Sequence, residues 1–427
     1  DQSSTTADIS AKALTATALT ANKAYDGGIT ASTTLTFNGL VGSETLGQTV
    51  GSTFDNKNVG SNKAVTVNSI TLADGSNGGL AANYSISAGQ TTTAHISPKS
   101  LTVSVNTASN KTYDSNSSAT VTITLSGFIG SETLTYTNAS SFNNKNVGTG
   151  KTVTVNSIML ADGNNGGLAS NYSVTPGQTT TANIAAKALT ISGITASSKT
   201  YDGNTSATLD TSSVLYTGLI SGDTFNGSYS GAFGNANVGT AKTVTITPSY
   251  TGADVSNYDI TDQTSTTADI SAKALTAIAS VSNKTYDATN FAAATLSISG
   301  LVGSETLSAT NTSTFNNKNV GTGKTVTVNS ITLADGSNGG LAANYSISAG
   351  QTTTANITAK SLTVSGITAS NKTYDGGTNA TLDASSVAYS GLISGDTFNG
   401  TYSGAFSDKN VGSGKTVAIT SSYSGAD

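Results

Sequence analysis

A tetrapeptide that returns along the whole chain constrains its fold more than any other feature. It is Lys-Thr-Tyr-Asp at residues 111–114, 199–202, 284–287 and 372–375, and Lys-Ala-Tyr-Asp at 23–26. A second set of lysines is spaced by 87, 88, 86 and 87 residues: Lys12, Lys99, Lys187, Lys273 and Lys360. Solenoid repeats usually have periods of about 20–50 residues, so a unit of this length can hold its own core. The sequence therefore predicts an array of small domains.

The spacing divides the chain into a tail and five repeats. We assign residues 1–12 to the tail of a preceding repeat, 13–99 to repeat 1, 100–187 to repeat 2, 188–273 to repeat 3, 274–360 to repeat 4 and 361–427 to an incomplete repeat 5. Repeats 1, 2 and 4 are type A, with Gly-Ser-Glu-Thr-Leu and an Asp-Gly-x-Asn-Gly-Gly loop. Repeats 3 and 5 are type B, with Ser-Gly-Asp-Thr-Phe and Ser-Tyr-x-Gly-Ala-Asp.

The two ends of the chain are related to repeat 3. Residues 1–12 match 262–273 almost letter for letter, and residues 422–427 match 249–254. By this comparison, seven residues would separate the end of the chain from a segment like its beginning. We therefore expect the chain to be a window from a longer array and one period of a higher-order repeat.

Alternating apolar and polar residues predict strands in every repeat. In repeat 2, Val121 and Ile123 alternate with polar residues, and so do Val153 and Val155. A period of two indicates half-buried strands, and no segment keeps a helical period over three turns. Clusters of Gly, Asn, Ser and Asp between these runs are typical of turns. The sequence predicts an all-β fold of tandem immunoglobulin-like antiparallel β-sandwiches of about 87 residues.

The junctions between repeats do not have the composition of flexible linkers. Residues 182–191 cross from repeat 2 to repeat 3 without Gly or Pro, and only Pro98 interrupts a boundary. Flexible linkers are rich in Gly and Ser, and stiff ones are rich in Pro. We expect the last strand of one repeat to run almost directly into the next repeat, so that the array forms an extended rod.

Composition excludes several function classes. Only 10% of residues are charged, the net charge is -5, and all 19 basic residues are Lys. Nucleic-acid binding needs clustered cations, so no nucleic-acid partner is expected. The absence of Cys rules out disulfides and thiolate metal sites. No apolar run approaches 20 residues, so no membrane span is expected in this segment.

Three motifs in fixed order resemble a family of bacterial repeats. They are Tyr-Asp-Gly at residues 25–27, 201–203 and 374–376, Lys-Asn-Val-Gly at 57–60, 145–148, 318–321 and 409–412, and Asn-Tyr-Ser at 83–85, 171–173 and 344–346. Together they resemble the YDG and mostly-beta-glycine-rich (MBG) repeats of filamentous-haemagglutinin-like bacterial surface adhesins. The resemblance covers the whole chain, with departures at Ser115, Ala288 and Ala236. It implies export, display at the cell surface and a stalk or adhesin role, and it names no ligand.

The Lys-Thr-Tyr-Asp motif admits two interpretations. As a chemical site, a Lys–Asn isopeptide bond would stiffen a chain without Cys, with Lys111, Asn171 and Glu132 in the three roles. As a structural feature, a strand ends in a turn, Tyr113 buries its ring and hydrogen-bonds its hydroxyl, and Asp114 caps the turn. The sequence favours the structural interpretation, because the acid differs between repeat types and Lys and Asn are frequent throughout.

Two further features invite metal or acid–base chemistry. The Gly-rich loops at Asp74, Asp162 and Asp335 offer one carboxylate each, whereas Ca²⁺ takes about six to eight oxygens. A plain turn is therefore favoured there, while calcium at a junction near Asp269 stays open. His95 is replaced by Asn in the equivalent positions of other type A repeats, which indicates a surface substitution and not a general base. We predict no enzyme, no catalytic, cofactor-binding or metal-binding residues, and no cofactor.

The sequence thus predicts a structural protein outside the cell. The expected role is the stalk or filament-forming repeat region of a large secreted bacterial surface adhesin, in cell adhesion or biofilm matrix. Two mechanisms stay open: passive spacers, or lateral or end-to-end association of like chains through edge strands. A carbohydrate- or ligand-binding repeat module is the alternative. The sequence does not identify a host or matrix ligand.

Overall fold

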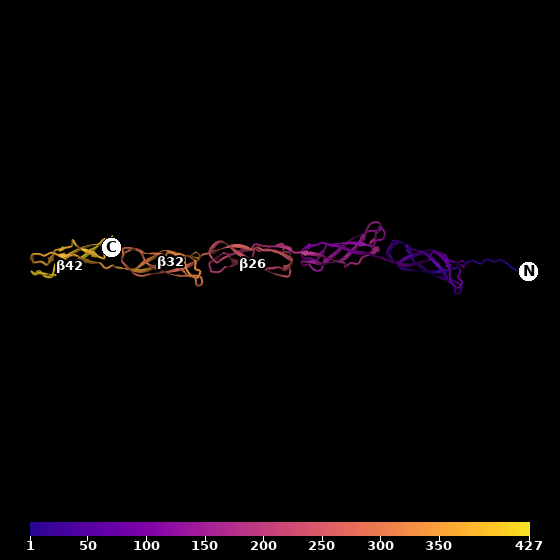
Figure 1. Cartoon of the computed structure of the whole chain (residues 1–427), viewed down its shortest axis with the longest axis horizontal. Coiled ribbons are helices and arrows are strands. Elements are labelled where there is room, and N and C mark those ends of the chain that lie inside the picture. Colours follow the sequence, from indigo (N-terminus) through magenta and orange to yellow (C-terminus); the bar gives the residue numbers. More distant parts are fainter. The chain divides into compact units, whose positions relative to one another are not determined.

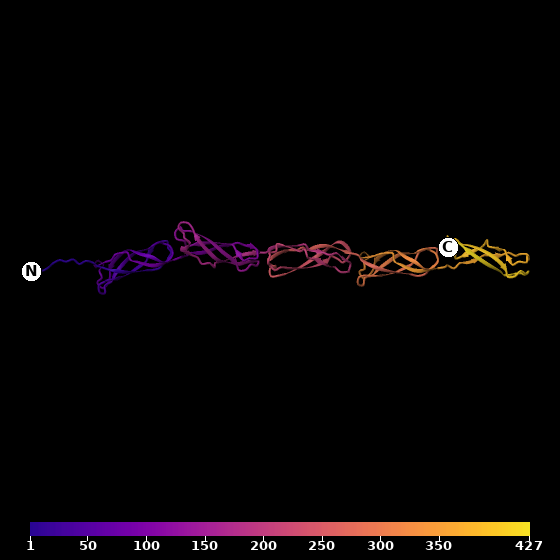
Figure 2. The same ribbon diagram turned by 180° about the vertical axis from the view of Figure 1, so that it is seen from behind.

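The computed structural model describes every residue from Asp1 to Asp427 and consists of strands, turns and loops (Figure 1, Figure 2). The helical segments are single turns of 3-10 helix: η1 (Ala81–Asn83), η2 (Ala169–Asn171), η3 (Val255–Asn257) and η4 (Ala342–Asn344). None is long and apolar enough to cross a membrane. The prediction of an all-β repeat fold is confirmed. The chain divides into two compact units, one of residues 1–191, 215–227 and 250–262 and the other of 192–214, 228–249 and 263–427.

The first two repeats contain the same series of strands. Up to Ser97 they are β1 (Lys12–Ala13), β2 (Thr15–Thr20), β3 (Lys23–Ala24), β4 (Thr30–Ala31), β5 (Thr33–Asn38), β6 (Leu46–Phe54), β7 (Gly60–Asp74), β8 (Tyr84–Ser85) and β9 (Thr91–Ser97). The next set is β10 (Lys99–Ser100), β11 (Thr102–Ala108), β12 (Lys111–Thr112), β13 (Ser118–Ala119), β14 (Val121–Ser126), β15 (Leu134–Phe142), β16 (Gly148–Asp162), β17 (Tyr172–Ser173) and β18 (Thr179–Ala185).

The third repeat differs at its start. It contains β19 (Lys187–Ser192), β20 (Thr195–Ala196), β21 (Lys199–Thr200), β22 (Ser206–Ala207), β23 (Leu209–Asp210), β24 (Leu215–Thr217), β25 (Asn226–Phe233), β26 (Gly239–Thr251), β27 (Tyr258–Thr261) and β28 (Ser265–Ser271). The fourth contains β29 (Lys273–Val281), β30 (Lys284–Thr285), β31 (Ala294–Ser299), β32 (Leu307–Phe315), β33 (Gly321–Asp335), β34 (Tyr345–Ile347) and β35 (Thr352–Thr358). The fifth contains β36 (Thr363–Ser365), β37 (Thr368–Ala369), β38 (Asn379–Ala380), β39 (Leu382–Asp383), β40 (Ala388–Ser390), β41 (Asn399–Phe406) and β42 (Val417–Ser424).

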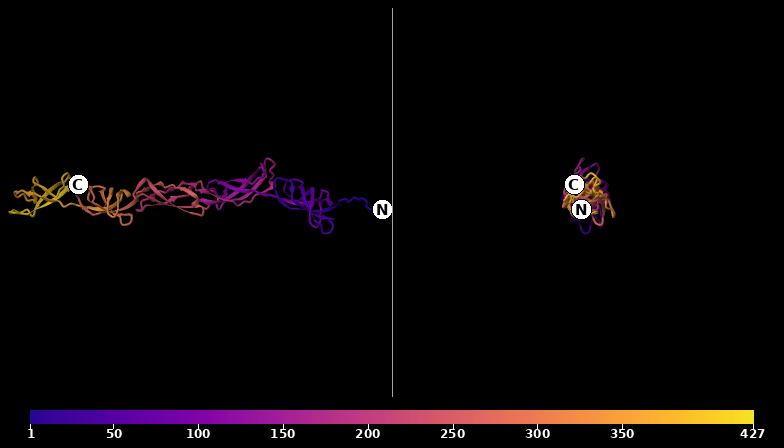
Figure 3. Two further views of the ribbon diagram at one scale, coloured as in Figure 1. Left: turned by 45° about the vertical axis from the view of Figure 1, so that its right-hand side comes forward. Right: turned by 90° about the vertical axis from the view of Figure 1, so that its left-hand side faces the viewer.

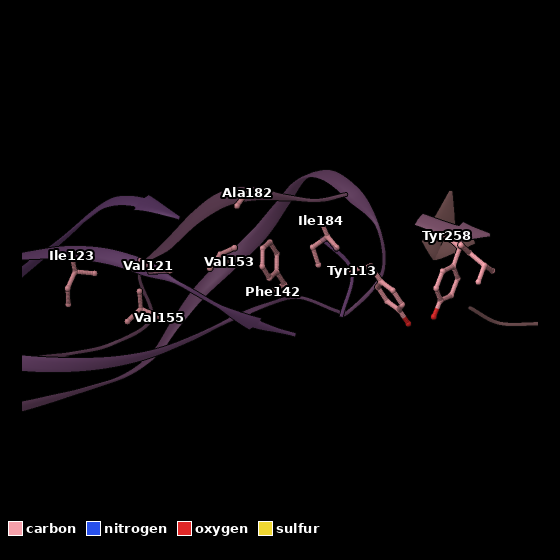
Figure 4. Packing of buried hydrophobic residues seen from close by; sticks show 10 residues of the cluster. Tyr113, Val121, Ile123, Phe142, Val153, Val155, Ala182, Ile184 and Tyr258 are labelled. Atoms are coloured by element: carbon pink, nitrogen blue, oxygen red, sulfur yellow. The ribbon is translucent and has the colours of Figure 1, made fainter. Parts of the chain in front are cut away.

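Repeat 2 is a sandwich of a large and a small sheet. The large sheet has the order β12-β18-β16-β15-β13, and the small one pairs β11 with β14. Val153 and Val155 on β16 face Val121 and Ile123 on β14, and all four side chains are buried in one cluster (Figure 4). The alternation read from the sequence therefore places alternate residues of β14 and of the middle of β16 in the core.

In repeats 1 to 4 the N-terminal segment pairs first with strands of the small sheet and then with the large sheet. In repeat 2, β10 runs parallel to β17, β11 runs antiparallel to β14, and β12 runs parallel to β18. One residue separates β18 from β19, and one separates β28 from β29. The chain therefore leaves the large sheet of one repeat and enters the first strand of the next within a single residue at these boundaries.

The Asp-Gly-x-Asn-Gly-Gly loop of repeat 2 packs its glycines against backbone. A Cβ at Gly163 or at Gly167 would lie 2.0 Å from the carbonyl oxygen of Thr133. The Asp162 carboxylate accepts a hydrogen bond of 2.7 Å from the Ala169 N–H. Asn165 donates 2.9 Å to the carbonyl of Ser131. The polar groups that suggested calcium thus serve a turn that closes onto the start of β15.

This packing predicts that Gly167→Ala destabilises repeat 2. The added methyl group overlaps backbone that cannot move without disturbing β15, so we expect a loss of about 2 kcal/mol in unfolding free energy. Chemical denaturation followed by hydrogen exchange of the amides in the substituted repeat measures it. Gly234→Ala is the control, because a Cβ there meets no atom within 4 Å. Equal effects of the two substitutions would contradict the packing argument.

Candidate functional site

The Lys-Thr-Tyr-Asp turn lies near the start of each repeat in sequence. In space, it holds its tyrosine at the end of the sandwich that contacts the next repeat. Lys23 contacts Asp26 at 2.8 Å and donates at the same distance to the carbonyl of Gly28. Asp26 in turn accepts a hydrogen bond of 2.9 Å from the Gly28 N–H. The ring of Tyr25 between them is 1% exposed. The turn-cap interpretation is therefore correct, and this lysine is occupied within its own turn.

The hydroxyl of this tyrosine reaches into the next repeat. Tyr25 donates a hydrogen bond of 2.7 Å to Oε1 of Glu132, and Tyr172 donates one of 2.7 Å to Oε2. Lys57 of repeat 1 contacts the same carboxylate at 2.9 Å. The two tyrosine rings meet edge to face, with centroids 5.5 Å apart. We call such a cluster, which unites the tyrosine and lysine of one repeat with the acid of the next, a joint.

The joint before a type B repeat uses two aspartates in place of one glutamate. Tyr258 donates a hydrogen bond of 2.5 Å to Asp223, while Tyr113 of the preceding repeat donates one of 3.3 Å to Asp254. Lys145 contacts Asp254 at 2.8 Å and Asp223 at 3.4 Å. The side chains of Tyr113 and Tyr258 lie at one end of the core cluster (Figure 4). Since Asp is one methylene shorter than Glu, two carboxylates divide the contacts that Glu132 makes alone.

The same arrangement recurs in the second unit of the chain. Tyr201 and Tyr345 each donate a hydrogen bond of 2.6 Å to Glu305. The next joint unites Tyr286 with Asp396 at 3.0 Å and Lys318 with Asp427 at 2.5 Å. In the first of these, Ala236 stands where the other joints have lysine, so the carboxylate has only its two tyrosine donors there.

An asparagine closes three of the four joints against the backbone of the preceding repeat. The Asn171 side chain accepts a hydrogen bond of 2.9 Å from the Val59 N–H and donates one of 3.0 Å to Asn58. Asn257 accepts in the same way from Val147, and Asn344 accepts from Val238, each at 2.9 Å. The Asn-Tyr and Lys-Asn-Val-Gly motifs are therefore the two halves of one contact.

The glycine of Tyr-Asp-Gly also packs closely against the next repeat. Gly27 has φ +78°, and a Cβ there would lie 2.6 Å from Ile129 of repeat 2. At the corresponding place repeat 2 has Ser115, also with positive φ, whose hydroxyl donates a hydrogen bond of 2.8 Å to Asp223. This departure from the motif is thus an additional contact across the joint.

The other candidate residues fall into separate places. Lys111 contacts Asp114, whereas Glu132 and Asn171 belong to the joint with repeat 1, so the three do not form an isopeptide site. His95 accepts a hydrogen bond of 3.2 Å from the Asn62 N–H. Asp269 accepts one of 2.7 Å from Ala241 in the equivalent turn. No group of three or more His, Cys, Asp or Glu side chains is placed to hold a metal ion.

Burial and hydrogen bonding act in opposite directions on the joint carboxylates. Burial raises the pKa of Glu132, but hydrogen bonds from Tyr172, Tyr25 and Lys57 outweigh it and hold the pKa below its usual value. The same balance lowers the pKa of Asp223. Burial, and then the bond to Glu132, raise the pKa of Tyr172 to about 12. The joint therefore stabilises an ionised acid beside neutral tyrosines.

These contacts define a class of protein: tandem β-sandwich repeats whose recurring motifs build the joints between neighbours. The model of the YDG domain matches the chain five times, at residues 10–94, 97–182, 185–267, 271–355 and 358–427. The chain belongs to the YDG domain family, and the predicted resemblance to YDG repeats is confirmed. No curated protein matches the sequence.

Removing the carboxylate of a joint should uncouple two repeats. Glu132→Ala leaves the buried hydroxyls of Tyr25 and Tyr172 without their acceptor, and such groups cost about 1–3 kcal/mol each. The matched control is Glu44→Ala, because Glu44 has the same place in repeat 1 but hydrogen-bonds only Tyr84. We expect Glu132→Ala to lower the unfolding free energy by about 2 kcal/mol more than the control. Hydrogen exchange of repeats 1 and 2 tests this, and equal losses would show that the carboxylate acts only within its own repeat.

The joints also predict stability that falls at both extremes of pH. The lowered pKa values of Glu132 and Asp223 give a contribution that is complete above about pH 4 and is lost as the pH falls below it. Tyr172 and Tyr258, with pKa values raised to about 12, contribute fully below about pH 10 and lose the contribution between pH 10 and 12. Unfolding midpoints measured from pH 2 to 12 check this, with ultraviolet titration of the phenols. Joint tyrosines that ionise at pH 10 would contradict it.

Proposed function

We propose that this chain is a structural stalk: the repeat region of a large secreted bacterial surface adhesin, which holds an adhesive part away from the cell. The observation that supports it best is the use of the recurring motifs. Tyr-Asp-Gly, Lys-Asn-Val-Gly and Asn-Tyr all contribute to joints between repeats, as Tyr25, Val59 and Asn171 illustrate. Because the recurring motifs form contacts between repeats, and not a binding cleft, the chain is suited to carrying mechanical load.

The joints also support rigidity, which a stalk needs. The joint between repeats 1 and 2 holds a buried carboxylate between the two repeats, because Glu132 is only 7% exposed. A flexible linker would instead carry Gly, Ser or Pro between the domains. Since strands of neighbouring repeats are separated by one residue at several boundaries, we propose that force passes along the backbone from sandwich to sandwich.

Location outside the cell and lack of enzymatic activity belong to the same proposal. A chain with 10% charged residues, no Cys and many Thr, Ser, Asn and Gly residues suits the surroundings of a bacterial surface. The acids of the joints are engaged by tyrosine and lysine, so they are not free to act as general acids or bases.

Small-angle scattering of the chain, together with surface labelling of intact cells, tests the stalk. We expect the scattering of an extended rod whose maximum dimension shortens when Tyr113→Ala opens the joint before repeat 3. Tyr229→Phe, outside the joints, is the control. Antibodies against the chain should label unbroken cells. A compact particle, a freely jointed chain without the substitution, or label only after lysis would each overturn the proposal.

A further inference from the structure

The first segment of repeat 2 (residues 99–112) and its last segment (residues 172–185) run in the same direction and touch twice. At the first contact β10 lies parallel to β17, and at the second β12 lies parallel to β18. The pairs that begin the two contacts are Lys99–Tyr172 and Lys111–Ile184. Between the contacts the segments separate, because β11 pairs with β14 instead. The long strands run lengthwise in each sandwich (Figure 3).

The same two contacts recur in repeats 1, 3 and 4. The first pairs β1 with β8, β19 with β27 and β29 with β34. The second pairs β3 with β9, β21 with β28 and β30 with β35. In each of these repeats the first contact begins with the lysine that sets the repeat period, and the second begins with the lysine of the Lys-Thr-Tyr-Asp or Lys-Ala-Tyr-Asp motif. Both sets of lysines therefore mark places where the two segments of a repeat meet.

A side chain extends the second contact beyond its two strands. The side chain of Asn110 accepts a hydrogen bond of 2.7 Å from the Asn183 N–H, and the Tyr113 N–H donates one of 2.8 Å to the carbonyl of Ala185. The equivalent side-chain bonds of repeats 1, 3 and 4, at 2.7 to 3.0 Å, are made by Asn22, Ser198 and Asn283. The residue before the motif lysine thus ties the first segment to the last.

We propose that the two parallel contacts are a shear clamp that resists unfolding when the chain is stretched. Tension pulls the first segment of a repeat backward along the chain and the last segment forward. Because the segments are parallel, these forces slide one strand along the other and load the evenly spaced hydrogen bonds of a contact together. Antiparallel strands pulled apart at one end lose their bonds one at a time. The clamp rests on the stalk proposed above only for its use by the cell.

Strand β18 is held from both sides. It pairs with β16 as well as with β12, and the Asn183 side chain accepts a hydrogen bond of 2.7 Å from the Gly150 N–H. Sliding β18 out of repeat 2 therefore breaks bonds to two neighbours at once. Unfolding under force follows the unfolding rate and not the equilibrium stability. A bond within the clamp should therefore change the unfolding rate under load more than a bond of equal strength elsewhere in the repeat.

Single-molecule force spectroscopy of repeat 2 within the whole chain tests the clamp. Handles attach only at Pro98→Cys and Ala186→Cys, since the natural chain has no cysteine, and they load this repeat alone. Asn110→Ala removes the side-chain bond across the clamp and should raise the unfolding rate at constant force at least about fivefold. The control is Asn138→Ala, which removes a bond of 3.1 Å to the carbonyl of Val121 outside the clamp and should change this rate less than about twofold.

The direction of pulling tests shear directly. Thr135→Cys with Met159→Cys places the handles on the two strands of the hairpin β15–β16, near its open end. Force then separates antiparallel strands pair by pair, so we expect unfolding at a lower force than between residues 98 and 186. Equal forces in the two directions, or equal unfolding rates for Asn110→Ala and Asn138→Ala, would overturn the clamp. Neither result bears on the scattering and labelling that test the stalk.

Discussion

A carboxylate that its own repeat cannot fully satisfy is the interaction on which the array depends. Within its own repeat, Glu132 receives a hydrogen bond only from Tyr172. It gains Tyr25 and Lys57 from the preceding repeat. A buried carboxylate is costly unless donors surround it, and two of the three donors to Glu132 belong to the preceding repeat. The stability of one repeat is thereby tied to that of the next, the nearest-neighbour behaviour expected of repeat proteins.

Both repeat types form joints with a neighbour of either sequence pattern through a tyrosine that the preceding repeat supplies. The preceding repeat always offers the tyrosine of the turn, as Tyr25 and Tyr113 do for a type A and a type B successor. The following repeat supplies either one glutamate or two aspartates. In the second case, the N–H and the hydroxyl of Thr224 donate hydrogen bonds to Asp254 and orient its carboxylate. This second carboxylate compensates for the shorter side chain of aspartate. The chain thus contains A–A, A–B and B–A joints, each of which includes the tyrosine of the preceding repeat.

The fold could be predicted from the sequence, whereas the joints could not. Val153 and Val155 reveal their strand through local alternation, which depends on neighbours two residues away. Tyr25 and Glu132 are 107 residues apart, and no local pattern relates them. Sequence reasoning therefore placed Glu132 beside Lys111, within one domain, although its lysine comes from the preceding repeat. The sequence carried one signal of the joint. Repeat 3 has Asp223 where repeat 2 has Glu132, and it also has a second aspartate, Asp254. Two positions that change together are expected when both side chains take part in the same contact.

The joint with Ala236 shows which of these contacts is indispensable. There the two tyrosines still donate to Glu305, at distances like those around Glu132, although the lysine is missing. At the other joints the lysine is partly exposed, with 39% of the Lys57 side chain accessible to solvent. Ion pairs of such exposure contribute only about 0–1 kcal/mol, because water already solvates the ammonium group well. The tyrosines lie inside and cannot be replaced by water, so the buried hydroxyl–carboxylate bonds, and not the ion pair, hold successive repeats together.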